Sequence, residues 1–212
     1  MTISPVLKTA LACLSVSLGA FASEKITLNH RGPKKPFNRI AQFKDHTMSL
    51  FATSPEVNYP VSVIAEPGGA LYALCDENAA VDRRPHQGSV LRLVDENNDG
   101  KADYMTKFIA DVDTPRGGQF LDDTLYLVHP PYISAYRDTN GDGVADEHKV
   151  LASGFGHDLK WKRGGDHTTN DLRIGIDGWI YVAIGDFGAS AVGSDGSKVK
   201  LLGGGVIRMR LD

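Results

Sequence analysis

A hairpin pattern occurs three times along this chain, and no other feature restricts the fold as strongly. Each copy has an apolar strand, a turn containing Gly or Asp, and a second strand with a Leu-Tyr or Ile-Tyr pair. The copies run from Val61 to Asp76, from Gly117 to Pro130 and from Leu172 to Asp186, with the pairs beginning at residues 71, 125 and 180. Their spacing of 54 and then 55 residues indicates a structural repeat.

Further strands complete each repeat. A third strand is expected at Ser89–Asp95, Tyr132–Asp138 and Gly205–Asp212, and a short fourth strand at 106–110 and 148–152. Four antiparallel strands repeated at about 40–55 residues are typical of a β-propeller blade. A β-sandwich would contain strands without this repeat, and few segments have the sustained helical period of an α/β fold. The sequence therefore predicts an all-β protein with four-stranded antiparallel propeller blades.

The repeat also sets the expected domain boundaries. Residues 59–212 would form a partial propeller of about three blades, because the third unit stops after its third strand. A propeller closes by joining its last blade to its first, which removes the sheet edges. We therefore expect a portion of a longer protein, with a half-propeller that pairs with itself as the alternative. Residues 23–58 contain Pro and have no period, so we expect an extended N-terminal lead-in there.

The N-terminus predicts export. Lys8 is followed by an apolar stretch over residues 9–22 that ends in Ala20-Phe21-Ala22, so residues 1–22 read as a signal peptide cleaved after Ala22. The alternatives are a lipidated Cys13 and a buried N-terminal helix. No later apolar run is long enough for a membrane span, so we expect a periplasmic or secreted protein without a transmembrane segment after cleavage.

Charge and cysteine usage exclude several classes of protein. The chain has 23 Lys and Arg against 26 Asp and Glu, with no basic stripe, which argues against a nucleic-acid partner. After cleavage Cys75 is the only cysteine, so neither an intramolecular disulfide nor a thiolate zinc site can form. Cys75 is expected in the core.

Two nearly identical acidic loops follow the third strands of the first two units. The shared pattern is D-x-N-x-D-G-x-x-D, and its polar members are Asp95, Asn97, Asp99 and Asp103 in the first loop and Asp138, Asn140, Asp142 and Asp146 in the second. Calcium takes six to eight oxygen ligands, which alternate positions of such a loop can supply. Position 12, which holds an acid in an EF-hand, is Thr106 or Lys149 here. We therefore predict structural calcium loops of a different type, with a solvated, metal-free turn as the alternative.

A polar loop, Gly165–Asn170, precedes the third hairpin and falls on a connection between blades. Such connections face the centre of a propeller. His167 beside Asp166 is a candidate general base with a neighbouring carboxylate, and the alternative is a solvated loop. Arg116 lies on the preceding connection and could face the same axis, although an exposed turn would also explain it.

The stretch from Asp166 to Gly188, together with the two acidic loops, resembles the membrane-bound-dehydrogenase-like β-propeller proteins of planctomycetes and verrucomicrobia. Those proteins are related to soluble glucose/sorbosone dehydrogenases that use pyrroloquinoline quinone (PQQ). The resemblance covers roughly residues 48–212. It implies a six-bladed ring, of which this chain would be the N-terminal part, with PQQ on the axis. It also implies that His167 takes a hydroxyl proton while hydride passes to the quinone, and that Asp166 lies against the cofactor.

The resemblance thus implies an exported PQQ-dependent dehydrogenase of sugars or alcohols, with structural calcium. PQQ is a polyanion whose cationic contacts would come from later blades, so we expect the isolated chain to be inactive. Without a CxxCH haem motif, the electron acceptor would be external. The alternative is a non-catalytic extracytoplasmic propeller that binds calcium and recognises carbohydrate or protein.

Overall fold

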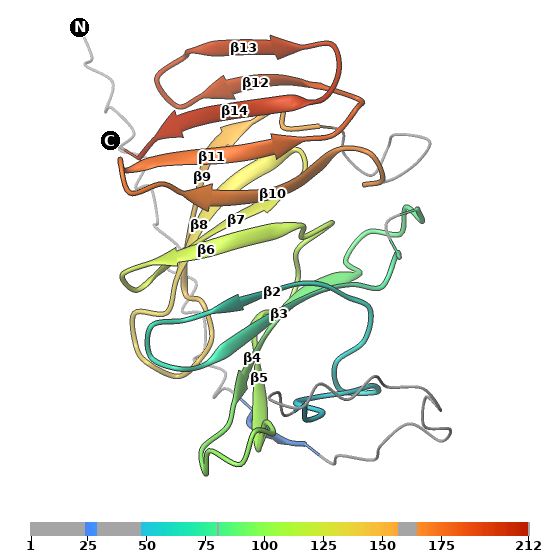
Figure 1. Ribbon diagram of the computed structural model, residues 1–212, viewed down its shortest axis with the longest axis vertical. Coiled ribbons are helices and arrows are strands. Elements are labelled where there is room, and N and C mark those ends of the chain that lie inside the picture. Colours follow the sequence, from blue (N-terminus) through green and yellow to red (C-terminus); the bar gives the residue numbers. More distant parts are fainter. Residues whose placement is uncertain (1–23, 29–47, 80, 157–164, 212) are drawn as a thin grey trace, which may run out of the picture.

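The computed structural model describes residues 24–28, 48–79, 81–156 and 165–211, and these residues form strands and turns without a helix. None of them belongs to a helix that could cross a membrane. The strands form three antiparallel sheets, which are the blades of a β-propeller (Figure 1). The all-β propeller fold predicted from the repeat is therefore confirmed. The expected signal peptide and Cys13 lie outside the described residues.

Blade 1 contains the first predicted unit. From the inner to the outer edge its strands are β2 (Pro60–Ala65), β3 (Leu71–Asp76), β4 (Gly88–Val94) and β5 (Tyr104–Ile109). A short strand from the lead-in, β1 (Ile26–Thr27), pairs with β5 at the outer edge. Phe51 and Val57 from the same lead-in pack with Cys75, which is buried as expected. The described parts of the lead-in thus belong to the blade, a role that their irregular pattern did not reveal.

Blade 2 is larger than its sequence unit. Its strands β6 (Gly117–Leu121), β7 (Thr124–His129), β8 (Tyr132–Arg137) and β9 (Glu147–Ser153) follow the predicted order. A hairpin of β12 (Ala189–Gly193) and β13 (Lys198–Leu201) extends the sheet beyond β9. This hairpin comes from the third unit, and its register places Val192 opposite Ser153. Blade 2 therefore has six strands, of which two come from its neighbour's part of the chain.

Blade 3 consists of β10 (Thr169–Ile174), β11 (Trp179–Ile184) and β14 (Gly205–Arg210), in that order. β11 is the central strand and buries Ile180, Val182 and Ile184 against blade 2. Because every second residue of a strand points to the same face, these three form one apolar stripe. The spacing of the stripe explains why the third hairpin could be recognised from sequence.

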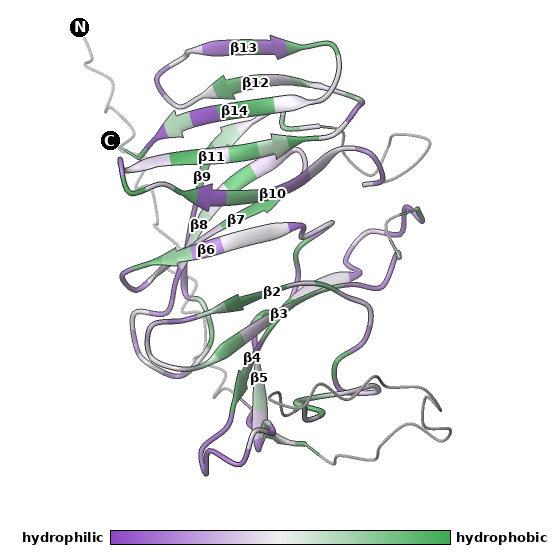
Figure 2. Ribbon diagram, viewed as in Figure 1, coloured by the Kyte–Doolittle hydropathy of each residue, from purple (hydrophilic) through white to green (hydrophobic). Residues whose placement is uncertain are grey.

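Apolar side chains fill the spaces between blades. Hydrophobic residues colour much of β11, whereas β13 is mostly hydrophilic (Figure 2). Between blades 1 and 2, Tyr72 meets Phe108 edge-on at 5.0 Å and Phe120 at 4.7 Å between ring centroids. Such aromatic pairs stabilise a core by about 0.5–1.5 kcal/mol beyond the area they bury. Tyr72 belongs to the repeated Leu-Tyr pair, so in this blade the repeat marks an inter-blade contact.

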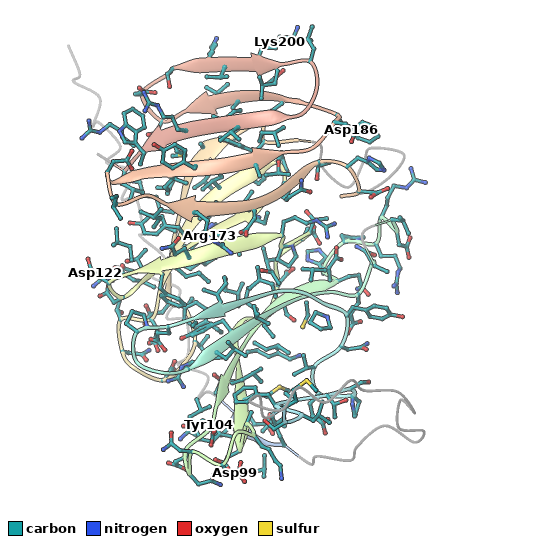
Figure 3. All side chains as sticks on the ribbon, viewed as in Figure 1. Asp99, Tyr104, Asp122, Arg173, Asp186 and Lys200 are labelled. Atoms are coloured by element: carbon teal, nitrogen blue, oxygen red, sulfur yellow. The ribbon has the colours of Figure 1, made fainter. Side chains whose placement is uncertain are left out.

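Antiparallel pairing separates two ends of the molecule. Asp76 pairs with Gly88 and Leu71 with Leu93, so the β3–β4 loop and the acidic loop after β4 lie at opposite ends of the blade. We call the end formed by segments 77–79, 81–87, 110–116, 130–131, 165–168 and 185–188 the connection face. Asp186 belongs to it and lies far from Asp99 of the first acidic loop (Figure 3).

Candidate functional site

A buried ion pair lies on the connection face. Asp76 ends β3, Arg116 precedes β6, and Arg116 Nη2 is 3.1 Å from Asp76 Oδ2. The two side chains are 0% and 10% exposed, respectively. Asp76 Oδ1 accepts the Asn78 backbone N–H at 3.1 Å. Arg116 is therefore not an exposed turn residue, because its guanidinium is buried against Asp76.

The pair has unused hydrogen-bonding capacity. Asp76 Oδ2 and both Arg116 Nε and Nη2 are buried without a well-directed hydrogen bond in the described structure. Burial lowers the pKa of Arg116, while Asp76 and Asp166 act in the opposite direction. A buried polar atom without a partner costs about 1–3 kcal/mol. These atoms could therefore bind an oxygen of a ligand or a water molecule.

Segments from all three blades surround Arg116. Its backbone N–H donates to the Val128 carbonyl at 3.0 Å. Gly165 packs so closely on the guanidinium that a Cβ at this position would overlap Nη2. Thr114 Oγ1 donates to the Pro130 carbonyl at 3.0 Å. Arg116 is thus fixed where segments from all three blades meet.

His167 lies beside this pair with a carboxylate near each ring nitrogen. Nδ1 is 2.7 Å from Asp186 Oδ1, and Nε2 is 3.3 Å from Asp166 Oδ2. The ring stacks on Phe187 at 5.2 Å between centroids, and its side chain is 42% exposed. His167 has a φ of 59°, which non-glycine residues rarely adopt. Since such strain often marks functional positions, the loop holds an accessible imidazole in a fixed orientation.

The structure therefore brings together the three residues predicted for the axis: Arg116, Asp166 and His167. It adds Asp76 and Asp186, which the sequence argument had not assigned to the site. Asp76 is the last residue of β3 in LYALCD, and Asp186 lies two residues after β11 in YVAIGD. A carboxylate close to the end of this strand in two of the three copies was the signal that could have identified them.

The first acidic loop is organised by its own backbone. Asp95 accepts the N–H groups of Asp99 at 3.1 Å and Gly100 at 2.9 Å. Asp103 accepts the Glu96 N–H at 2.8 Å and an Asn97 side-chain N–H at 3.0 Å. The carboxylates thus cap amides within a tight turn.

The second acidic loop repeats this arrangement. Asp138 accepts N–H groups from Gly141 and Gly143, each at 2.7 Å. Asn140 and Asp142 accept the N–H groups two residues ahead at 2.9 Å each, and Asp146 accepts the Thr139 N–H at 3.1 Å. The strand order shows that the two loops occupy equivalent positions, because one connects β4 to β5 and the other connects β8 to β9.

The Asp and Asn side-chain oxygens of both loops are ligand types that suit calcium, but in neither loop do they converge on one point. Across the described ranges, no three or more His, Cys, Asp or Glu side chains are grouped so that they could hold a metal ion. Calcium therefore stays a prediction for Asp95, Asn97, Asp99 and Asp103 and for their counterparts in the second loop. Both loops lie at the end opposite His167, so a metal there would be structural.

The charge balance around His167 bears on a quinone cofactor. Arg116 is the one cation within the described group, against the carboxylates of Asp76, Asp166 and Asp186. An excess of carboxylates repels a polyanion, because like charges in a partly buried site are weakly screened. The described residues therefore do not by themselves fit PQQ.

Comparison with known sequences gives a family match. The model of a family described as a domain of unknown function, DUF7133, matches residues 32–212. No curated protein matches the chain.

Similar solved structures include a carbohydrate-active enzyme of family AA12 from Trichoderma reesei, at 16% identity and a TM-score of 0.45 over 77% of this chain and 33% of that one. A gluconolactonase from Xanthomonas campestris has 22% identity and a TM-score of 0.43 over 68% and 46%. A putative oxidoreductase (glucose dehydrogenase) from Thermus thermophilus has 17% identity and a TM-score of 0.38 over 60% and 39%. The chain spans about a third of the first structure and less than half of the others. At these scores no function is carried over from them.

Proposed function

The chain belongs to the DUF7133 family, and we propose that its connection face activates a hydroxyl group of a sugar or alcohol. The observation that carries this proposal is the 2.7 Å contact between His167 Nδ1 and Asp186 Oδ1 on an accessible, polar face. A carboxylate that receives Nδ1–H selects one tautomer of the imidazole. Nε2 is then the atom that can accept a proton.

The proton transfer follows from this arrangement. A substrate hydroxyl within hydrogen-bonding distance of Nε2 would give its proton to that nitrogen, and Asp186 would stabilise the resulting imidazolium. Asp166 lies 3.3 Å from Nε2, where it can also accept a hydrogen bond from a neighbouring substrate hydroxyl. His167 would therefore act as the base, and the two carboxylates would orient the ring and the substrate.

Arg116 would position the ligand rather than exchange protons. Its Nε, which has no hydrogen bond in the described structure, can donate one to an oxygen brought close to the buried pair, while Nη2 stays paired with Asp76. Charge-assisted hydrogen bonds of this type are stronger than neutral ones. Asp76 keeps the guanidinium in place from the other side.

The finer assignment is a PQQ-dependent dehydrogenase, which rests on the resemblance of Asp166–Gly188 and of the acidic loops. Since the described site is rich in carboxylates, the cations that bind PQQ would have to lie outside the described residues. Calcium in the acidic loops, an external electron acceptor and export to the periplasm or beyond belong to the same proposal. The N-terminal pattern over residues 1–22 supports export.

A non-catalytic binding propeller is the second candidate. The three carboxylates around one cation favour it, because this balance suits hydroxyl donors better than an anionic cofactor. In this case His167 and its partners would bind a sugar without oxidising it.

A dye-reduction assay tests the proposal. The protein is used as its host produces it, PQQ and calcium are added, and a panel of aldoses and alcohols serves as substrates. His167→Ala should lower turnover by about 10²–10⁴, the usual contribution of a general base. Asp122→Asn is the control, because Asp122 is an exposed turn residue on the opposite face and Asn tolerates its φ of 54°. Undiminished turnover in His167→Ala would refute the general base. Sugar binding without turnover in the parent protein would favour the second candidate.

A further inference from the structure

A separate cleft opens on the connection face between blades 1 and 2. Its volume is about 1050 Å³, at the upper end of the range for small-molecule sites. One side is formed by the loop around His86 and by the connection at residues 111–113. The other side is formed by the turn at residues 129–132 and by side chains of β8 and β9. The connection that borders this cleft continues to Arg116, so the two sites are neighbours.

His86 is held on one side of the cleft in an unusual conformation. Its φ is 60°, its backbone N–H donates to Asp113 Oδ1 at 2.7 Å, and its ring Nδ1 is 2.7 Å from Asp111 Oδ2. The side chain is nevertheless 71% exposed. Two carboxylates thus fix both the backbone and the ring of an accessible residue. With Nδ1–H directed to Asp111, Nε2 is available as an acceptor.

The same device occurs at His167, which has a φ of 59° and an Nδ1 contact of 2.7 Å with Asp186. Residues held against their backbone preference by several contacts tend to cluster at functional sites. Positive φ also occurs at five other non-glycine residues, so the feature that His86 and His167 share is the combination of this backbone with a ring Nδ1 held 2.7 Å from a carboxylate. His86 is therefore built into the cleft as a recognition group.

The opposite wall presents aromatic and apolar surface. The rings of Tyr136 and His148 stack at 4.4 Å with an interplanar angle of 10°. Tyr132 and Val150 are 42% and 46% exposed. Burial lowers the pKa of His129 to about 4, so this residue, which contacts Ser134 Oγ at 2.8 Å, is neutral at neutral pH. The wall thus offers the exposed rings of Tyr132 and His148 together with the Val150 side chain.

The two sides together define the chemistry of a ligand. Asp111, Asp113 and His86 Nε2 are hydrogen-bond acceptors, so they require a ligand that donates hydrogen bonds. The flat rings opposite require an apolar face. A pyranose ring has both features, with hydroxyl groups around its rim and C–H groups on its faces. A cation is less well matched, because Arg83 also lines the cleft.

We infer that this cleft binds a neutral saccharide. One sugar ring stacks on the wall that contains Tyr132, and its hydroxyl groups donate hydrogen bonds to His86, Asp111 and Asp113. The volume exceeds what one ring needs, which indicates a short oligosaccharide. This site is distinct from the one around His167, and it would operate whether or not His167 acts as a base.

Calorimetric titration of the chain with cellobiose, maltose, xylobiose and lactose tests the inference. At least one of them should bind, and Tyr132→Ala and His86→Asn should each weaken binding by about tenfold or more, the loss of one good contact. Both positions are exposed, and Asn tolerates the positive φ of residue 86. Asp122→Asn on the opposite face is the control and should bind as the parent does. Binding that His86→Asn and Tyr132→Ala weaken is thereby assigned to this cleft and not to the site around His167.

Two results would overturn the inference. The first is absence of binding by all four disaccharides at millimolar concentration, including the case in which tetramethylammonium or arginine binds instead. The second is binding that neither Tyr132→Ala nor His86→Asn weakens.

Discussion

Removing one member of the buried Arg116–Asp76 pair should destabilise the protein strongly. Arg116→Met leaves the Asp76 carboxylate in a place with 0% exposure and without a countercharge. Breaking a buried pair in this way typically costs about 3–5 kcal/mol. For a domain of this size, each kcal/mol lowers the melting temperature by about 2–4 °C. We therefore expect a decrease of about 6–20 °C.

The double variant Asp76→Asn/Arg116→Met separates the ion pair from packing. The amide introduced at position 76 would be neutral, and its oxygen can still accept the Asn78 N–H that Asp76 accepts. Removing both charges should restore most of the lost stability, since a buried pair is often close to neutral relative to uncharged replacements. Urea unfolding of the parent, both single variants and the double variant gives the coupling energy. Additive losses, or a loss below about 1 kcal/mol in Arg116→Met, would refute the reasoning.

Two further predictions concern pH and metal. The folded-state pKa of His129, about 4, lies below its ordinary value of 6.5, so the unfolded chain binds a proton first as the pH falls. The neutral His129 should therefore contribute about 3 kcal/mol to the free energy of unfolding above pH 6.5, and this contribution should be lost between pH 6.5 and 4. Because His129→Gln removes the titrating group, it should flatten the pH profile of urea unfolding over this window. Calcium should raise the melting temperature and a chelator should lower it, with Asp95→Ala and Asp138→Ala reducing the difference. Identical melting curves in calcium and chelator, with no metal found by elemental analysis, would contradict the calcium loops.

Local sequence patterns predicted the strands well, because each strand's pattern depends on residues that are neighbours in the sequence. The Leu-Tyr and Ile-Tyr pairs identified β3, β7 and β11, and the polar loops separated the third strands from the fourth. The β12–β13 hairpin was not predicted, since it has no counterpart in the first two units. Its pairing with β9 depends on a contact between units, which periodicity does not encode.

The site was predicted in part for the same reason. Arg116, Asp166 and His167 were predicted to lie near the axis because inter-blade connections face it, and the structure shows them close together on the connection face. The contact of Arg116 with Asp76 joins residues of different blades, and the burial of that pair depends on how the connections pack. Neither follows from residue types alone. The carboxylate Asp186 is 19 positions from His167 and reaches it only because β10 and β11 pair as a hairpin.

The addition of the β12–β13 hairpin from the third unit to blade 2 has a consequence for the order in which the chain can fold on the ribosome. Blade 1 has all its described strands once Ile109 has emerged, whereas the outer edge of blade 2 waits for Leu201. Domains form progressively during synthesis, and unpaired strand edges are prone to aggregation while they wait. Until then β9 has a free edge, which the third unit covers as it arrives. Blades 2 and 3 should therefore acquire protection from hydrogen exchange together, after blade 1.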